Sequence, residues 1–115
     1  MQADCIFCNI AQGKIPANLV YEDEHVVAFH DISPAAPVHV LVIPKKHIAN
    51  LLEVSIEDCQ FVTQLMTKIP LIAEQLGLAE KGFRTVINTK DDGGQTVHHL
   101  HVHILGGRFM TWPPG

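Results

Sequence analysis

Three histidines alternate with apolar residues near the end of the chain, in the segment 98–105, HHLHVHIL. Successive side chains of a strand point to opposite faces, so His99, His101 and His103 would share one face and the apolar residues the other. Same-face neighbours lie roughly 7 Å apart along a strand. Imidazoles grouped in this way could ligate a metal, transfer protons or attack an electrophile. The alternative is a solvent-facing strand side that happens to be rich in histidine.

Cys5 and Cys8 form a second group that could do chemistry. A thioredoxin-type motif should follow a strand, and none precedes this pair. Half of a zinc site, needing two further ligands, is the functional interpretation, and two small buried residues on a helix are the alternative. Three cysteines cannot make an even disulfide framework, and Cys59 is interpreted as a packing residue.

The composition indicates one globular domain spanning residues 1–115. Apolar residues make up 47% and charged residues 17% of the chain, unlike disordered sequences. A net charge of -4 disfavours long nucleic acid as a partner, although backbone amides and histidines could still bind a small anion. Neither a secretory signal nor an apolar run of transmembrane length is visible, so we expect a cytoplasmic protein without a membrane partner.

Strands and helices that would position these groups follow from the apolar patterns. A short helical turn is expected at 9–13 and a turn at 89–96, while the aromatic tail should pack on something.

Ser55 is a good N-cap for a long helix, which Pro70 should kink or divide and Gly77 should end. That helix carries an apolar stripe made of Phe61, Leu65, Ile69, Ile72 and Leu76. The expected strands cover residues 17–22, 25–30, 39–44, 83–88 and 98–105.

The expected fold class is α+β, with a mainly antiparallel sheet of about five strands, one long helix and a short N-terminal helix. Exposed sheet edges and the apolar stripe of the helix also make dimerisation a reasonable expectation.

Residues 99–105 resemble the signature of the histidine triad family, His-φ-His-φ-His-φ-φ with φ apolar. The resemblance extends to nearly the whole chain and favours the Hint branch of the family over the Fhit branch. It includes the segments FHDISP at 29–34, HVLVIPKKH at 39–47, GGQT at 93–96 and WPPG at 112–115.

This resemblance implies a fold, an activity and partners. The fold would be HIT-like, in a homodimer whose two sheets join into one continuous sheet. Each subunit would bind a purine nucleoside monophosphate and hydrolyse the bond between phosphorus and nitrogen in a purine nucleoside 5′-phosphoramidate. The activity would be that of an adenosine 5′-monophosphoramidase, through a nucleotidyl-histidine intermediate.

The resemblance also assigns roles to residues. His101 would be the nucleophile, with His103 and His39 near the phosphate. Thr96 stands where many relatives carry serine, and would contact the phosphate. Asp31 would accept hydrogen bonds from the ribose hydroxyls. The remaining nucleotide-binding positions are Phe7, Ile10, Phe29 and Ile32 at the base, Asn88 and Gln95 at the phosphate end, and Trp112 reaching toward the partner subunit.

Cys5, Cys8, His47 and His99 match the zinc ligands of those family members that carry a Cys2His2 site. The implied zinc would be structural, and catalysis would require no cofactor. His98 departs from the aromatic residue common at its position.

Two other functions remain as alternatives. The first is a noncatalytic purine nucleotide-binding or regulatory interaction module with the same pocket. The second is metal-dependent hydrolysis, in which the three alternating histidines would be catalytic zinc ligands. That second alternative competes with the Cys2His2 site for His99.

Overall fold

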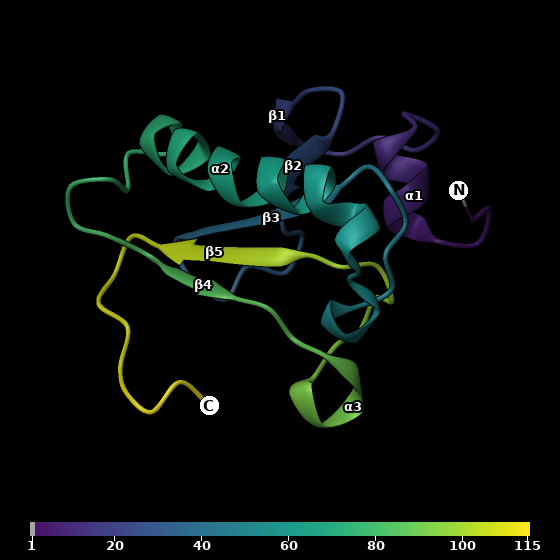
Figure 1. Ribbon diagram of the computed structural model, residues 1–115. Helices are drawn as coiled ribbons and strands as arrows, with labels where there is room; N and C mark the ends of the chain where they lie inside the picture. The colour runs from purple at the N-terminus through teal and green to yellow at the C-terminus, as the bar shows by residue number, and fades with distance from the viewer. Residues whose placement is uncertain (1) are drawn as a thin grey trace.

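The computed structural model describes residues 2–115 and contains a five-stranded sheet with the strand order β1-β2-β3-β5-β4 (Figure 1). All neighbouring strands run antiparallel. This confirms the predicted α+β fold class. The strands are β1 (Leu19–Glu22), β2 (Val26–His30), β3 (Val38–Pro44), β4 (Arg84–Val86) and β5 (Val102–Gly106).

Three helices and two 3-10 turns complete the fold. The long helix α2 lies across one face of the sheet, and the short helix α1 lies at the opposite end of the molecule from α2's C-terminus (Figure 1). A one-turn helix, α3, occupies the segment expected to be a turn. Within residues 2–115, none of the helices is long and apolar enough to cross a membrane. The bounds are α1 (Ile6–Ala11), α2 (Cys59–Gln75) and α3 (Lys90–Gly93), with 3-10 turns at Leu51–Glu53 and Ile56–Asp58.

The central strand β3 contributes to two separate clusters of buried residues. Val40 and Val42 pack with α2 on one face of the sheet. Leu41 and Ile43 pack on the other face, with Phe7 and other residues of α1. Because both faces are covered, β3 reads as a continuous apolar run, which is unusual for an antiparallel sheet.

The long helix begins and ends close to the predicted residues. Ser55 caps the first turn as expected and forms a capping box with Asp58, although that turn is 3-10 and α2 proper starts at Cys59. Gly77 follows the C-cap with a φ of 74°, which glycine adopts without strain. The expectation that Pro70 could divide the helix is wrong, because α2 runs through it without a break. The carbonyl that loses its donor to Pro70 belongs to Met66, which is exposed, so water can replace the lost hydrogen bond.

The histidine segment differs from its prediction in extent. Only Val102–Gly106 forms a strand, so His99 and His101 lie before it. β3 continues to Pro44 opposite these residues, but the Leu100 N–H donates to the Ile48 carbonyl at 2.6 Å and not to β3, and the Pro44 carbonyl lies 2.9 Å from Nε2 of His99. The predicted alternation nevertheless holds, since the apolar residues Leu100, Val102 and Ile104 all pack in the cluster beneath α2.

The C-terminal tail does not pack as expected within one chain. Trp112 is 80% exposed and Phe109 87% exposed. Arg84 of β4 holds the tail, by donating to the carbonyl of Thr111 at 2.9 Å and by placing its guanidinium 5.9 Å from the centre of the Trp112 ring.

Candidate active site and candidate metal centre

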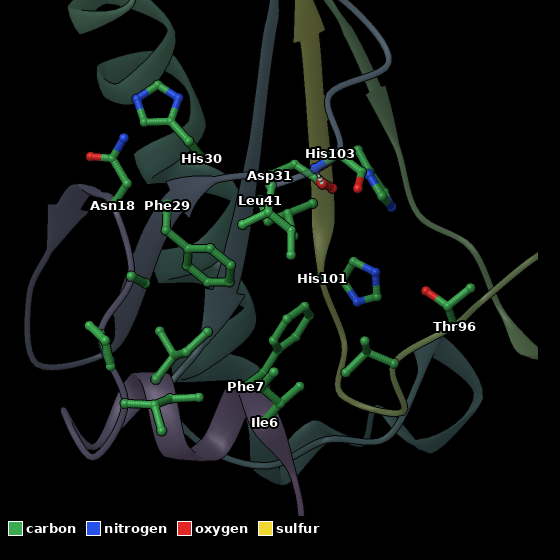
Figure 2. Close-up of a pocket in the computed structure, with 17 residues that line it drawn as sticks. Ile6, Phe7, Asn18, Phe29, His30, Asp31, Leu41, Thr96, His101 and His103 are labelled. Carbon is green, nitrogen blue, oxygen red and sulfur yellow. Dashed lines mark hydrogen bonds between the residues drawn. The ribbon is translucent and has the colours of Figure 1, made fainter.

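A pocket of about 660 Å³ opens on the face of the sheet that carries α1 (Figure 2). One end is polar, with His101, His103 and Thr96, and the middle is apolar. Eight residues predicted for the site line it, namely Phe7, Ile10, Phe29, Asp31, Ile32, Thr96, His101 and His103. The other lining residues are Ile6, Ile15, Pro16, Ala17, Asn18, His30, Ser33, Leu41 and Val97.

The register of the sheet places an apolar floor beside the histidines. Phe29 pairs with Leu41, and Leu41 pairs with His103, so the three side chains form a row across β2, β3 and β5. Phe7 of α1 stands edge-on to both Phe29 and His101, with ring centres 5.4 and 5.2 Å apart. The resulting slot between aromatic and aliphatic side chains has the shape and chemistry to hold a flat ring next to the histidines.

A hydrogen bond holds one ring nitrogen of His101 and fixes the direction of the other. Its Nδ1–H donates to the carbonyl of His99 at 2.7 Å, so the lone pair of the neutral ring is on Nε2. Burial lowers the pKa of His101, while the bond to the His99 carbonyl and the nearby Asp31 act in the opposite direction. A neutral imidazole with a fixed tautomer is the form that can act as a nucleophile.

A backbone amide fixes the tautomers of the other two histidines at the site. The Ala35 N–H donates to Nδ1 of His39 at 3.0 Å, which leaves the ring proton of His39 on Nε2. That Nε2 lies 2.9 Å from Nδ1 of His103, which must therefore accept. The remaining proton of His103 is on Nε2, a buried nitrogen with no hydrogen-bond partner within residues 2–115. His103, which lines the pocket beside His101, thus has an N–H donor without a partner.

Burial, followed by the neighbouring His101 and His39, lowers the pKa of His103 to about 4. His103 is therefore neutral near pH 7 and donates through a single N–H.

Asp31 occupies the loop after β2, at the mouth of the pocket. Its Oδ1 accepts the backbone N–H of Ser33 at 2.7 Å, and its Oδ2 lies 3.5 Å from Nε2 of His39. The carboxylate is therefore oriented by the loop, and it retains acceptor capacity for hydroxyl groups of a bound molecule.

Gln95 supports the loop beneath Thr96 and does not line the pocket. Its buried side-chain Nε2 donates to the carbonyls of Ala49 and Val97, at 2.8 and 3.0 Å, and its Oε1 accepts the backbone N–H of Lys90 at 2.9 Å. All the polar atoms of this side chain are thus engaged with backbone, so a direct contact between Gln95 and a phosphate stays a prediction.

Three more predicted site residues lie outside the pocket lining. His39 contacts the site through His103, as described above. Asn88 and Trp112 are not among the lining residues, and Trp112 extends from the exposed tail. Conversely, Leu41 was not predicted, although its position two residues after His39 on one strand places both on the same face. Asn18 and His30 carry no comparable signal in the sequence.

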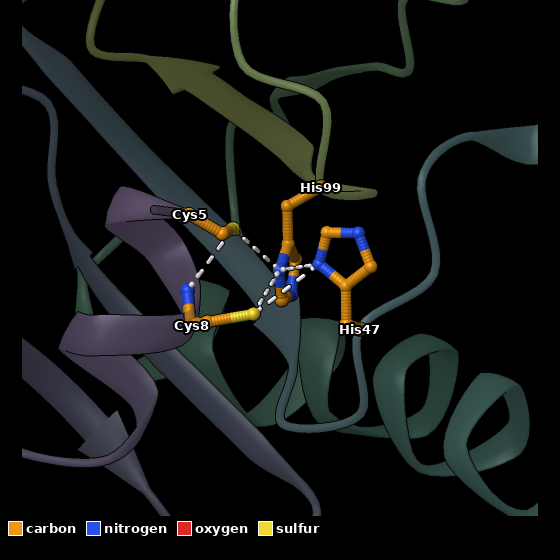
Figure 3. A group of neighbouring side chains, drawn as sticks. All are labelled: Cys5, Cys8, His47 and His99. Carbon is orange, nitrogen blue, oxygen red and sulfur yellow. Dashed lines mark hydrogen bonds between the residues drawn. The ribbon is translucent and has the colours of Figure 1, made fainter. Parts of the chain in front are cut away.

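Cys5, Cys8, His47 and His99 form a separate cluster, and none of the four lines the pocket (Figure 3). Their ligand atoms all lie within 4.8 Å of one another, close enough to hold a metal ion. The separations are 3.2 Å between Cys8 Sγ and His47 Nδ1, 3.4 Å between Cys5 Sγ and His99 Nδ1, and 3.2 Å between the two Nδ1 atoms. Bond lengths of about 2.3 Å to sulfur and 2.0 Å to nitrogen in a tetrahedron place such atoms about 3.5 Å apart, so the set fits Zn²⁺.

Hydrogen bonding supports this fit. Nε2 of His99 donates to the Pro44 carbonyl at 2.9 Å, which leaves its Nδ1 as a lone pair facing the cysteines. A backbone carbonyl on the second nitrogen is the usual partner of a metal-bound histidine. Burial lowers the pKa of His99 to about 4, so this lone pair is available at neutral pH.

Metal-dependent hydrolysis through all three alternating histidines does not fit this geometry. His99 belongs to the cysteine cluster, whereas His103 groups with Asp31 and His39. That second group is a poor metal site, because Nδ1 of His39 already accepts a backbone N–H. Coordination through Nε2 would require both nitrogens of His39 to be without protons.

A family model described as HIT domain matches residues 12–110 of the chain. An uncharacterised HIT-like protein of Synechococcus elongatus is 55% identical over 115 residues, covering 100% of both chains. The protein named purine nucleoside phosphoramidase of Escherichia coli is 46% identical over 108 residues, covering 94% of this chain and 91% of its own.

Solved structures give the same picture. The HIT family hydrolase of Legionella pneumophila superimposes with a TM-score of 0.94 at 50% identity, covering 97% of this chain and 100% of that one. A histidine triad protein of Clostridium difficile gives a TM-score of 0.92 at 45% identity, covering 96% of both chains.

Proposed function

Because the chain belongs to the HIT domain family, we propose that it is a cytoplasmic hydrolase of purine nucleoside 5′-phosphoramidates with His101 as nucleophile. One observation carries the proposal. The bond of 2.7 Å from Nδ1–H of His101 to the carbonyl of His99 leaves a neutral, aimed Nε2 at the polar end of the pocket. The name of the Escherichia coli relative supports the substrate class.

In this proposal the pocket binds a purine nucleoside monophosphate group along its length. The base occupies the slot between Phe7, Phe29 and Leu41, and the ribose hydroxyls donate to Asp31. The phosphate then lies between His101, His103 and Thr96, with Asn88, Gln95 and Trp112 as further predicted contacts. A slot lined by π-faces and aliphatic groups binds a flat ring, and the polar groups fix its orientation.

The reaction has two steps. Nε2 of His101 attacks the α-phosphorus, the bond between phosphorus and nitrogen breaks, and the amine leaves with the electron pair of that bond. That electron pair takes a proton from water, and the neutral His103 contributes as a hydrogen-bond donor to the phosphoryl oxygens through Nε2–H. A second water then attacks the nucleotidyl-histidine, the bond between phosphorus and Nε2 of His101 breaks, and the nucleoside monophosphate leaves while the proton of the attacking water returns to the solvent. A preorganised donor to the developing charge contributes about 10²–10³-fold to the rate.

A Zn²⁺ ion held by Cys5, Cys8, His47 and His99 would be structural, joining the N-terminal segment to the histidine segment. All four ligands come from the protein, so no coordination position is left for a substrate.

We propose that the chain acts as a homodimer with one continuous sheet. The strand β4 is at an edge of the sheet, and Phe83 and Ile87, which flank it, are 38% and 36% exposed. Pairing of two β4 strands about a twofold axis would bury this edge. Trp112 at the exposed tail would then be available to the partner subunit.

The test of the proposed function is the hydrolysis of adenosine 5′-phosphoramidate by the wild type, by His101→Ala and by the control His98→Ala. His98 is exposed and does not line the pocket. The wild type and the control should release the amine at equal rates, and His101→Ala should lose activity by about 10³-fold or more. A wild type that binds adenosine 5′-monophosphate (AMP) but releases no amine would instead indicate the noncatalytic nucleotide-binding module.

A further inference from the structure

The helix α1 belongs to the pocket and to the metal cluster at the same time. Cys5 is its N-cap and Cys8 lies in its first turn, and both sulfurs face His47 and His99 (Figure 3). The other side of the helix lines the pocket through Ile6, Phe7 and Ile10 (Figure 2). A displacement of α1 would therefore change both sites.

Little besides this cluster and apolar packing holds α1 in place. A helix of six residues is too short to be stable by itself. Within residues 2–115, the polar contacts from Cys5 and the residues of α1 to parts of the chain beyond residue 14 are those of Cys5 and Cys8 with the two histidines. A thiol and an imidazole make only weak hydrogen bonds, whereas thiolate and imidazole are strong ligands of zinc.

The polar end of the pocket is anchored independently of the metal. The His99 side chain donates to the Pro44 carbonyl, and the Leu100 N–H donates to the Ile48 carbonyl at 2.6 Å. These bonds fix the carbonyl that orients His101, whether or not a metal is bound. The two ends of the pocket should therefore respond differently to metal removal.

We propose that metal occupancy of the cysteine and histidine cluster controls nucleotide affinity by holding α1 as a wall of the base slot. The inference rests on the proposed function for the identity of the ligand. Coupling between two sites is reciprocal, so a bound nucleotide raises the affinity of the cluster for zinc by the same factor. The bound nucleotide and the metal thus stabilise the same position of α1.

Calorimetric titration tests this coupling, with AMP added to zinc-loaded protein and to protein stripped with a chelator. We expect AMP to bind about tenfold or more weakly without zinc, within the usual range of coupling between sites. A competition titration with a chromophoric chelator should show zinc affinity rising by the same factor when AMP is saturating. Equal AMP affinities with and without zinc would overturn the coupling, whereas zinc-loaded protein that fails to bind AMP would overturn the proposed function itself.

Ribose 5-phosphate separates the two ends of the pocket, because it carries the phosphate and sugar without a base. Its affinity should change less than that of AMP when zinc is removed. If ribose 5-phosphate loses as much affinity as AMP, zinc does not act through the wall of the base slot, and the proposal fails. In turnover, the same argument predicts a raised KM and a retained kcat for the metal-free enzyme.

Hydrogen exchange shows whether the effect is local. Zinc removal should increase exchange of the α1 amides and leave those of β3 and β5 protected, whereas a loss of protection throughout the sheet would overturn the proposal. The variant Cys8→Ala should reproduce the AMP affinity of metal-free protein and no longer respond to zinc. The control Cys59→Ser alters an exposed cysteine outside the cluster and should retain the full response.

Discussion

Nε2 of His39 lies 2.9 Å from Nδ1 of His103, a residue 64 positions away in the sequence. The Ala35 N–H donates to Nδ1 of His39, so the ring proton of His39 is on Nε2 and donates to Nδ1 of His103. The ring proton of His103 is therefore on Nε2, which has no hydrogen-bond partner within residues 2–115. His39 therefore acts in the site as a positioning residue. Its contribution is to ensure that His103 presents a donor, and not a lone pair, to the pocket.

Replacing His39 tests this role. The change His39→Ala should let His103 adopt either tautomer and lower kcat about 10- to 100-fold, with a smaller change in AMP affinity. Nitrogen NMR shifts of His103 should show Nε2–H alone in the wild type and a mixture of tautomers in the variant. Unchanged shifts together with a reduced kcat would contradict the relay. The exposed His98→Ala serves as the control.

The titration of His103 should lower the free energy of unfolding as the pH decreases. Its pKa is about 4 in the folded protein, against an ordinary value of 6.5. The unfolded chain therefore binds more protons than the folded chain between these values, so the free energy of unfolding falls as pH drops from 6.5 to 4. The groups that face His103 are His39 and His101, which lower its pKa, and Asp31, which raises it.

Urea denaturation at pH 7 and pH 5 measures this effect. The wild type should lose more stability between the two values than His103→Gln, which cannot titrate at that position. An identical loss in both proteins would show that other groups dominate the pH dependence. All samples should contain zinc in excess, so that differences in metal occupancy of the cysteine and histidine cluster do not contribute to the comparison.

Gln95 should prove important for stability. Truncation to Ala would leave the carbonyls of Ala49 and Val97 and the N–H of Lys90 without the partner that the buried Gln95 side chain gives them, at a cost of about 1–3 kcal/mol. Lys90 also has a φ of 57°, a conformation that its N–H bond to Gln95 helps to hold. Thermal or urea denaturation measures the loss, and the exposed Gln60→Ala on α2 should change stability by less than about 0.5 kcal/mol.

Gly106 should not tolerate a side chain. A Cβ there would lie 2.6 and 2.8 Å from the two Cδ atoms of the buried Leu78. We expect Gly106→Ala to destabilise the protein by about 1–3 kcal/mol through overpacking. Adding Leu78→Val should recover part of that loss, and a double-mutant cycle measures the recovery.

Gly93→Ala is the matched control for that substitution. The nearest atom to a Cβ there lies at an ordinary 3.6 Å, so the change should be nearly neutral. If Gly106→Ala were equally neutral, Leu78 would have to move freely within its cluster.

The face assignments of the sheet were predictable, and so were most strand ends to within about two residues, but the start of β5 was not. Alternation alone places Leu100 under α2 and His101 in the pocket, because side-chain direction has a period of two residues. Where β5 begins depends instead on the Leu100 N–H, which donates to the Ile48 carbonyl although β3 continues to Pro44 on the opposite side. That information comes from tertiary pairing and is not contained in the segment itself.

The candidate site shows the same division. The histidines and Asp31 were found through their pattern and resemblance, and the structure brings them together. The supporting contacts of Gln95 depend on carbonyls at Ala49 and Val97, which have no sequence signal. The alternative that Pro70 divides the helix was wrong, because a propensity for helix breaking was weighed without the surroundings of Met66, the exposed residue whose carbonyl loses its donor.

Alternate residues of β3 belong to the two clusters on opposite faces of the sheet. Even positions such as Val40 and Val42 pack beneath α2, and odd positions such as His39 and Leu41 face the side of the sheet that carries the pocket. Substitutions at odd positions can thus alter the pocket side while the packing beneath α2 stays constant. A single-residue insertion within β3 would have the opposite effect, because it would exchange the two faces downstream and impair packing and binding together.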